Sequence, residues 1–169
     1  IGSSFFGVLD FVMGEIFADL VKEAAEGETA SVFYGVFDRR KFQLTYCNVG
    51  QPLTIHYKAA ENKIDLLPGV ESPYKVGENQ EIKLGSHQID LNPSDKLILC
   101  SRGFLSLTND EGRSWGLDEI LSLVKNNVGK DVHGLRNEIF FQASKFSKSQ
   151  PRDLTAIVCE VKERIMKLA

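Results

Sequence analysis

The spacing of apolar residues changes along this chain and divides it into segments. Over the N-terminal part they recur every three or four positions: Phe5, Leu9, Val12 or Met13, Ile16 and Leu20. This is the stripe that one face of an amphipathic helix presents. The pattern predicts one long helix that ends near Gly27, and it leaves a break near Gly14 open.

After this helix the spacing becomes two, and β-branched and aromatic residues dominate. Residues 31–37 and 43–47 alternate in this way around the polar turn 38–41, which predicts a β-hairpin. Both faces of these two strands are apolar, so we expect two central strands covered on both faces. Further strands are predicted in the middle of the chain, as an antiparallel meander: 54–58, 63–67, 81–91 with a break near Gly85, and 96–100.

The C-terminal part returns to helical spacing and then to one last strand. Helices are predicted over 117–125 and 132–146, and a strand over 154–161. A helix, a run of strands, two helices and a strand give the α+β class. The prediction is an antiparallel β-sandwich, two sheets face to face, flanked by helices.

Length and composition fit one ordinary domain over residues 1–169, with 43% hydrophobic and 25% charged residues. The formal charge of −3 gives no electrostatic footprint for nucleic acid. No apolar run approaches the roughly 18 residues that span a bilayer, so direct membrane insertion is not expected. The three cysteines lie singly in strand-like segments, which favours reduced thiols and a cytoplasmic location. Because the chain begins with Ile1, we expect it to be the C-terminal part of a longer polypeptide.

Five short segments, in order and at matching spacing, resemble motifs of one enzyme family. The segment 31–53 resembles the central hairpin of SpoIIE-like and RsbU-like phosphatases of the PPM type. Residues 69–76, 91–104, 109–116 and 151–158 resemble four later motifs of that family. The resemblance covers roughly residues 30–161 and implies the PPM-type phosphatase fold, here without its N-terminal strands.

The resemblance also implies a chemistry that this chain has partly lost. Such enzymes hold Mn²⁺ or Mg²⁺ between aspartates, and a metal-bound water attacks the phosphorus of a phosphoserine or phosphothreonine. The aspartate of the family's Thr-Asp-Gly turn is replaced by Arg102, and the first aspartate of its closing Asp-Asp motif is replaced by Arg152. Asp153 is retained as a weak candidate ligand, and the Gly-Asp and Gly-His-Gly elements do not occur before the first helix.

Each of these residues also has a structural interpretation. Taken singly, an arginine in a loop at a strand end is more often a surface residue, and an aspartate before an apolar strand is more often a turn cap. Both arginines, however, fall on positions that the resemblance assigns to metal ligation. We therefore expect Arg102 and Arg152 to lie in one cationic cleft that binds phosphate. His56, His87 and His133 form no nucleophilic triad in sequence, and no catalytic residue is assigned.

Three functions remain open. The favoured one is a catalytically degenerate phosphatase domain that acts as a regulatory protein-binding module of a bacterial partner-switching pathway and needs no cofactor. Its partner by resemblance is a phosphorylated or acidic regulatory protein with a STAS-like fold. The alternative is an active Mn²⁺- or Mg²⁺-dependent phosphatase in which residues upstream of Ile1, or Asp110, Asp118 or Asp153, supply the missing ligands. The third is a domain that only dimerises or links other modules.

Overall fold

A computed structural model describes residues 3–23, 25–76, 85–148 and 153–162. These residues form a mixed α+β structure of antiparallel sheets with three α-helices, so the predicted class is confirmed. The chain divides into two compact units that interleave in sequence. The described residues of Ile1–Gln51 and Pro68–Asp90 form unit 1, and those of Pro52–Leu67 and Leu91–Ala169 form unit 2. None of the described helices combines the length and hydropathy needed to cross a membrane.

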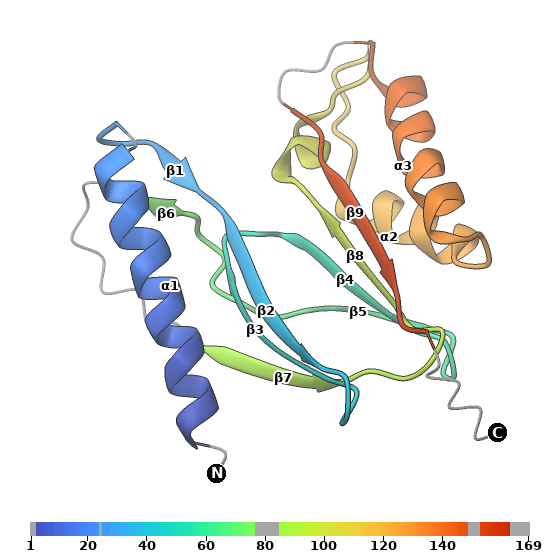
Figure 1. Cartoon of the computed structure of the whole chain (residues 1–169). Helices are drawn as coiled ribbons and strands as arrows, with labels where there is room; N and C mark the ends of the chain where they lie inside the picture. Colours follow the sequence, from blue (N-terminus) through green and yellow to red (C-terminus); the bar gives the residue numbers. More distant parts are fainter. Residues whose placement is uncertain (1–2, 24, 77–84, 149–152, 163–169) are drawn as a thin grey trace, which may run out of the picture. The chain divides into compact units, whose positions relative to one another are not determined.

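Unit 1 is one helix packed on a three-stranded sheet (Figure 1). Helix α1 (Ser3–Glu23) runs through Gly14 without a break, and Met13 and Phe17 on its inner face are buried. The sheet has the order β2-β3-β7, formed by strands Val32–Asp38, Gln43–Val49 and Ser86–Asp90. Cys47 and Val49 of β3 contact the two buried residues of α1. The apolar stripe of the helix thus covers one face of this sheet.

The predicted hairpin of β2 and β3 is confirmed, with Val32 opposite Val49 and Asp38 opposite Gln43. The Asp38 carboxylate closes the turn by accepting hydrogen bonds from the backbone N–H groups of Arg40 and Lys41, at 2.8 and 3.2 Å. The prediction that both strands are central is right for β3 and wrong for β2. Strand β2 is an edge strand of the described sheet, and its residues are half-buried or exposed. An apolar pattern on both faces does not specify the number of paired neighbours.

The predicted meander is also wrong, because β3 pairs with β7 and not with the next strand in sequence. The chain leaves the sheet of unit 1 at Gly50, whose φ of 68° favours glycine. Pro52 then follows and has no N–H to donate to a ladder. Two further strands of two residues each, β1 (Thr29–Ala30) and β6 (Tyr74–Lys75), pair with one another and were not predicted. Of the predicted strand 81–91, residues 81–84 lie outside the described residues.

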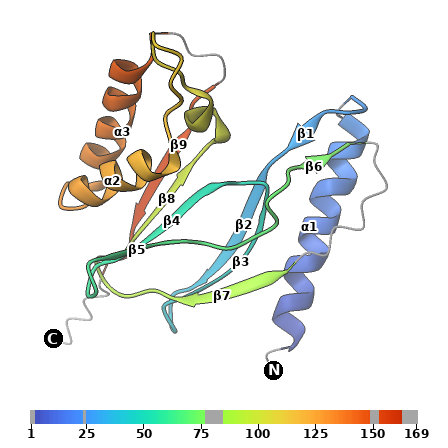
Figure 2. The ribbon, with the colours of Figure 1, turned by 180° about the vertical axis from the view of Figure 1, so that it is seen from behind.

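Unit 2 is a four-stranded antiparallel sheet with two helices on it. The sheet order is β5-β4-β8-β9, and the strands are Lys63–Leu66, Leu53–Lys58, Lys96–Cys100 and Ala156–Glu160. Helix α2 (Leu117–Asn127) packs against α3 (Val132–Phe146), and both views in Figures 1 and 2 place α3 alongside β9. Asp131 caps α3 by accepting a hydrogen bond from the Gly134 N–H. These elements confirm the predicted helices and the last strand.

The core of unit 2 joins every layer of the unit. It consists of fully or nearly fully buried residues from the sheet, the 3₁₀ helix η1 (Arg102–Ser106) and both α-helices: Leu53, Ile55, Ile98, Cys100, Phe104, Ile120, Val124, Leu135, Ile139 and Ala143. At the edge of this core the single tryptophan, Trp115, stacks on Phe146 with ring centroids 5.8 Å apart. The packing holds the loop that follows η1 against the end of α3. The face-to-face packing of two sheets stays a prediction.

Candidate functional site

The two altered motifs flank paired ends of neighbouring strands. Strands β8 and β9 are antiparallel, with Cys100 opposite Ala156, so the residues after β8 meet those before β9. Ser101 makes this junction: its N–H donates to the Thr155 carbonyl (2.9 Å) and its hydroxyl donates to the Asp153 carbonyl (3.2 Å). The same hydroxyl accepts a hydrogen bond from the Thr155 N–H at 3.1 Å. The segments 101–103 and 153–155 therefore form one hydrogen-bonded turn region.

Arg102 is held in this region by its neighbours in sequence. It is the first residue of η1, which begins after the extended Ser101 (φ −64°, ψ 158°). Gly103 is buried, and a Cβ atom at this position would collide with the Asp153 carbonyl oxygen. Glycine is therefore required for η1 to approach the segment before β9. Arg102 itself is half-buried, with a buried Nε atom.

Arg152 lies outside the described residues. The structure does place Asp153, the next residue, against the turn that contains Arg102. That the two guanidinium groups share one cleft stays a prediction. In the sequence Arg152 directly precedes Asp153, whose carbonyl Ser101 contacts.

The residues at this turn do not fit a divalent metal ion. Asp153 is exposed, and its backbone carbonyl accepts the hydrogen bond from the Ser101 hydroxyl. Arg102 carries a positive charge where the resemblance expects a carboxylate, and hard cations need oxygen ligands. Burial raises the pKa of the adjacent Cys100 thiol to about 12, so this thiol is protonated near neutral pH. Among the described residues, no three Asp, Glu, His or Cys side chains lie together as a metal site.

The other candidate ligands lie apart from this turn. Asp110 forms an ion pair with Lys148, and Asp118 lies in the first turn of α2. Neither forms a group of three potential ligands with Asp153 within the described ranges. The alternative in which these aspartates replace the missing ones gains no support from their placement.

The histidines have separate environments, and one of them is part of a buried pair. His56 of β4 and Asp95, before β8, are 2% and 0% exposed, and their Nε2 and Oδ2 atoms are 2.9 Å apart. The Asp95 carboxylate also accepts hydrogen bonds from the backbone N–H groups of Ala59 (2.8 Å) and Asn92 (2.9 Å). This pair was missed in the sequence. The pattern of residues 54–58 predicted the strand that contains His56. It gave no local signal for a hydrogen-bond partner 39 residues away.

The structure resembles solved bacterial phosphatase domains. It matches the RsbU and RsbW domains of Rv1364c from Mycobacterium tuberculosis with a TM-score of 0.73, at 13% identity, over 92% of this chain and 42% of that one. The SiaA-PP2C domain of Pseudomonas aeruginosa matches with a TM-score of 0.65, at 15% identity, over 78% and 52% of the two chains. The SpoIIE phosphatase domain of Bacillus subtilis, presoaked with Mn, matches with a TM-score of 0.58, at 13% identity, over 82% and 59%.

These similarities show the PPM-type phosphatase fold, as predicted. The chain spans less than two thirds of the length of each of these solved chains. No curated protein sequence matches it significantly. The family model for stage II sporulation protein E matches residues 9–162, which is most of the 169-residue chain. The chain therefore belongs to the SpoIIE family.

Proposed function

We propose that this chain is a catalytically degenerate phosphatase domain that acts as a regulatory protein-binding module in bacterial phospho-signalling of the partner-switching type. The observation that carries the proposal is Arg102, the first residue of η1, which stands where the resemblance expects a metal-binding aspartate. The similarity to an RsbU domain supports the pathway class. A cytoplasmic location and a phosphorylated or acidic partner, STAS-like by resemblance, belong to the same proposal.

Electrostatics opposes metal binding at this turn. A divalent cation about 4 Å from a guanidinium is repelled by about 8 kcal/mol at an effective dielectric constant of about 20. Arg152, one residue before Asp153, adds a second positive charge nearby in sequence. One exposed carboxylate, that of Asp153, does not offset two arginines. The same two charges favour a phosphate group through charge-assisted hydrogen bonds.

Calorimetry with Mn²⁺ and a turnover assay test the proposal. We expect no binding heat at millimolar Mn²⁺ and no hydrolysis of a phosphoserine peptide or p-nitrophenyl phosphate. Turnover that depends on Mn²⁺, disappears with a chelator and is absent from a mock purification would establish the active enzyme instead.

A double variant, Arg102→Asp with Arg152→Asp, sharpens the test. It restores two carboxylates and should recover part of the metal binding, while hydrolysis stays negligible. The matched control is Arg39→Asp with Arg40→Asp in the β2–β3 turn, which changes the net charge equally in the other unit. Equal gains of Mn²⁺ affinity in both double variants would show a nonspecific effect of charge and would count against a site at the turn.

A further inference from the structure

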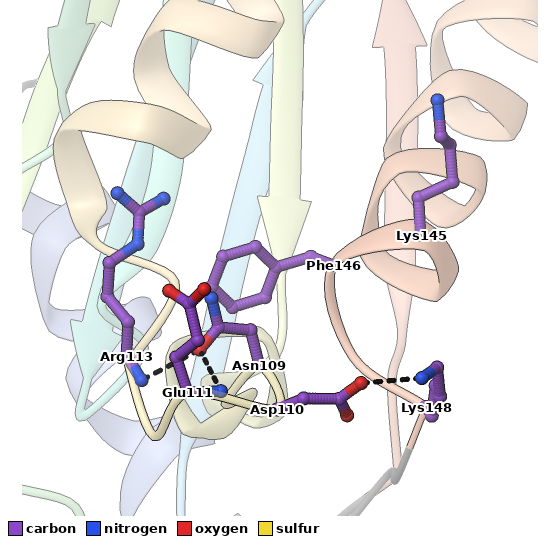
Figure 3. A pocket seen from close by; sticks show the side chains of 7 residues that line it. All are labelled: Asn109, Asp110, Glu111, Arg113, Lys145, Phe146 and Lys148. Atoms are coloured by element: carbon purple, nitrogen blue, oxygen red, sulfur yellow. Dashed lines mark hydrogen bonds and ion pairs between the residues drawn. The ribbon is translucent and has the colours of Figure 1, made fainter.

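A second polar cleft lies within unit 2, between the loop 109–113 and the end of α3. Its volume is about 330 Å³, at the lower end of the range of small-ligand pockets. It is lined by Asn109, Asp110, Glu111, Arg113, Lys145, Phe146 and Lys148. Figure 3 shows Arg113 on the loop side, the two lysines on the α3 side and the Phe146 ring between them. None of these residues belongs to the turn around Arg102.

The loop that forms one wall is rigidly built. The Asn109 side-chain oxygen accepts hydrogen bonds from the N–H groups of Glu111 (3.1 Å) and Arg113 (2.9 Å), as drawn in Figure 3. The backbone closes the loop through the Asn109 N–H, which donates to the Arg113 carbonyl at 3.0 Å. Gly112 supplies the left-handed residue of the turn, with φ 78°. Arg113 therefore leaves a fixed backbone position.

The Arg113 guanidinium is also oriented by what it contacts. Its Cζ atom lies 5.6 Å from the centroid of the Phe146 ring, and Phe146 in turn stacks on the buried Trp115. The guanidinium also forms an ion pair with Glu119, whose Oε1 atom lies 3.3 Å from Nη2. A planar cation fixed against an aromatic ring keeps its remaining N–H groups available for bidentate hydrogen bonds with oxyanions.

The lysines at the other wall differ in their partners. Lys148 forms an ion pair with Asp110, and both side chains are largely exposed. The Lys145 ammonium lies 5.3 Å from the Phe141 ring centroid, and no carboxylate within the described residues is paired with it. Exposed ion pairs are worth about 0–1 kcal/mol, so an incoming anion can replace Asp110 as the partner of Lys148.

We propose that this cleft binds the dianionic phosphate group of a phosphorylated serine or threonine in a partner protein, with Arg113 and Lys148 as its main contacts and Asp110 as the internal competitor. The proposal is independent of the site around Arg102. The charges on the lining select the ligand class. A single carboxylate would only replace Asp110 as the partner of Lys148, with little net gain in binding free energy. A phosphate dianion carries one more negative charge and is therefore attracted more strongly to Arg113 and Lys148.

Two features of the cleft limit its affinity. Glu111 adds a second negative charge to the lining, and the carboxyl end of α3 presents the negative end of the helix dipole. The site is also open to water, so salt screens it. We therefore expect weak, strongly salt-dependent binding of a phosphopeptide and almost none of its unphosphorylated twin.

Fluorescence anisotropy with a labelled phosphoserine peptide tests this proposal on the full chain. Lys148→Gln should weaken binding about threefold to tenfold and Arg113→Gln by about tenfold or more. Asp110→Asn should strengthen binding about twofold to fivefold, because it removes the competitor of the phosphate. The controls come from an equally exposed ion pair in unit 1: Lys22→Gln and Asp19→Asn change the net charge in the same way and should leave the affinity unchanged.

Each arm of the experiment separates one alternative. The cleft variants are repeated in an Arg102→Gln background, where the same ratios are expected if the two sites are independent. Unchanged affinity in Lys148→Gln and Arg113→Gln, or equal effects of the two Asp→Asn variants, would refute the cleft without touching the proposed function. A glutamate twin of the peptide that binds as well would refute selection for a dianion. Inorganic phosphate that competes as strongly as the peptide would refute a partner's side chain as the source.

Discussion

Replacement of Asp95 by alanine should destabilise unit 2 more than any exposed substitution. The Asp95 carboxylate is fully buried and satisfies two backbone N–H groups as well as His56. An unsatisfied buried donor costs about 1–3 kcal/mol, and Asp95→Ala removes the acceptor of two backbone N–H groups and the partner of the His56 ring. Since these hydrogen bonds form one network, their costs do not simply add. We expect Asp95→Ala to lower the free energy of unfolding by about 3–5 kcal/mol.

The assay is urea denaturation followed by the fluorescence of Trp115, the only tryptophan, which is 5% exposed in unit 2. Asp95→Asn should fall between wild type and Asp95→Ala, because an amide retains one acceptor oxygen but places an N–H₂ group against a donor. The matched control is Asp90→Ala at the end of β7, where the aspartate is exposed and bonds Gln43. Its cost should stay below about 1 kcal/mol. If Asp95→Ala lowered the free energy of unfolding by less than about 1 kcal/mol, with an unchanged slope of that free energy against urea concentration, the buried Asp95 network would not stabilise unit 2 as argued.

Three further outcomes are expected. Gly103→Ala should cost about 1–3 kcal/mol in urea denaturation, because its methyl group would collide with the Asp153 carbonyl; a cost near zero would contradict the close approach. Hydrogen bonds from two lysine side chains lower the pKa of Asp65 from 3.8 to about 2, so its stabilisation is present above pH 4 and is lost towards pH 2. The difference in unfolding free energy between wild type and Asp65→Asn should therefore vanish over that interval. Iodoacetamide at pH 8 should alkylate the exposed Cys159 in the native protein and reach the buried Cys100 only in denaturant, as read by mass spectrometry.

Local patterns predicted the elements of this fold well. The alternation in β2 and β3 and the short polar turn between them specified a hairpin, because strand period and turn chemistry are encoded by neighbouring residues. Helix α3 followed from its apolar face, and the structure adds Asp131 as its N-cap. Pairings between distant segments were not encoded in this way. The return of β7 to β3 and the contact of His56 with Asp95 depend on tertiary packing, which residue spacing does not specify.

The candidate site shows the same division. Sequence order and resemblance drew attention to Arg102 and Asp153, and the pairing of β8 with β9 brings their segments together. The cleft beside Phe146 was not predicted, since its walls come from a loop and from the end of a helix about 30 residues later. Considered separately in the sequence, the loop 109–113 and the end of α3 have the composition of ordinary surface segments. Only their packing through Trp115 gives them a common cavity.

At the turn around Arg102, the residues that make the structural contacts differ from the positions that the resemblance assigns to metal binding. Its contacts come from the Ser101 hydroxyl, from backbone groups of residues 153–155 and from the absence of a side chain at Gly103. These three contacts are made by residues other than Arg102. The family match over residues 9–162 thus includes a turn that carries Arg102 where the resemblance expects an aspartate.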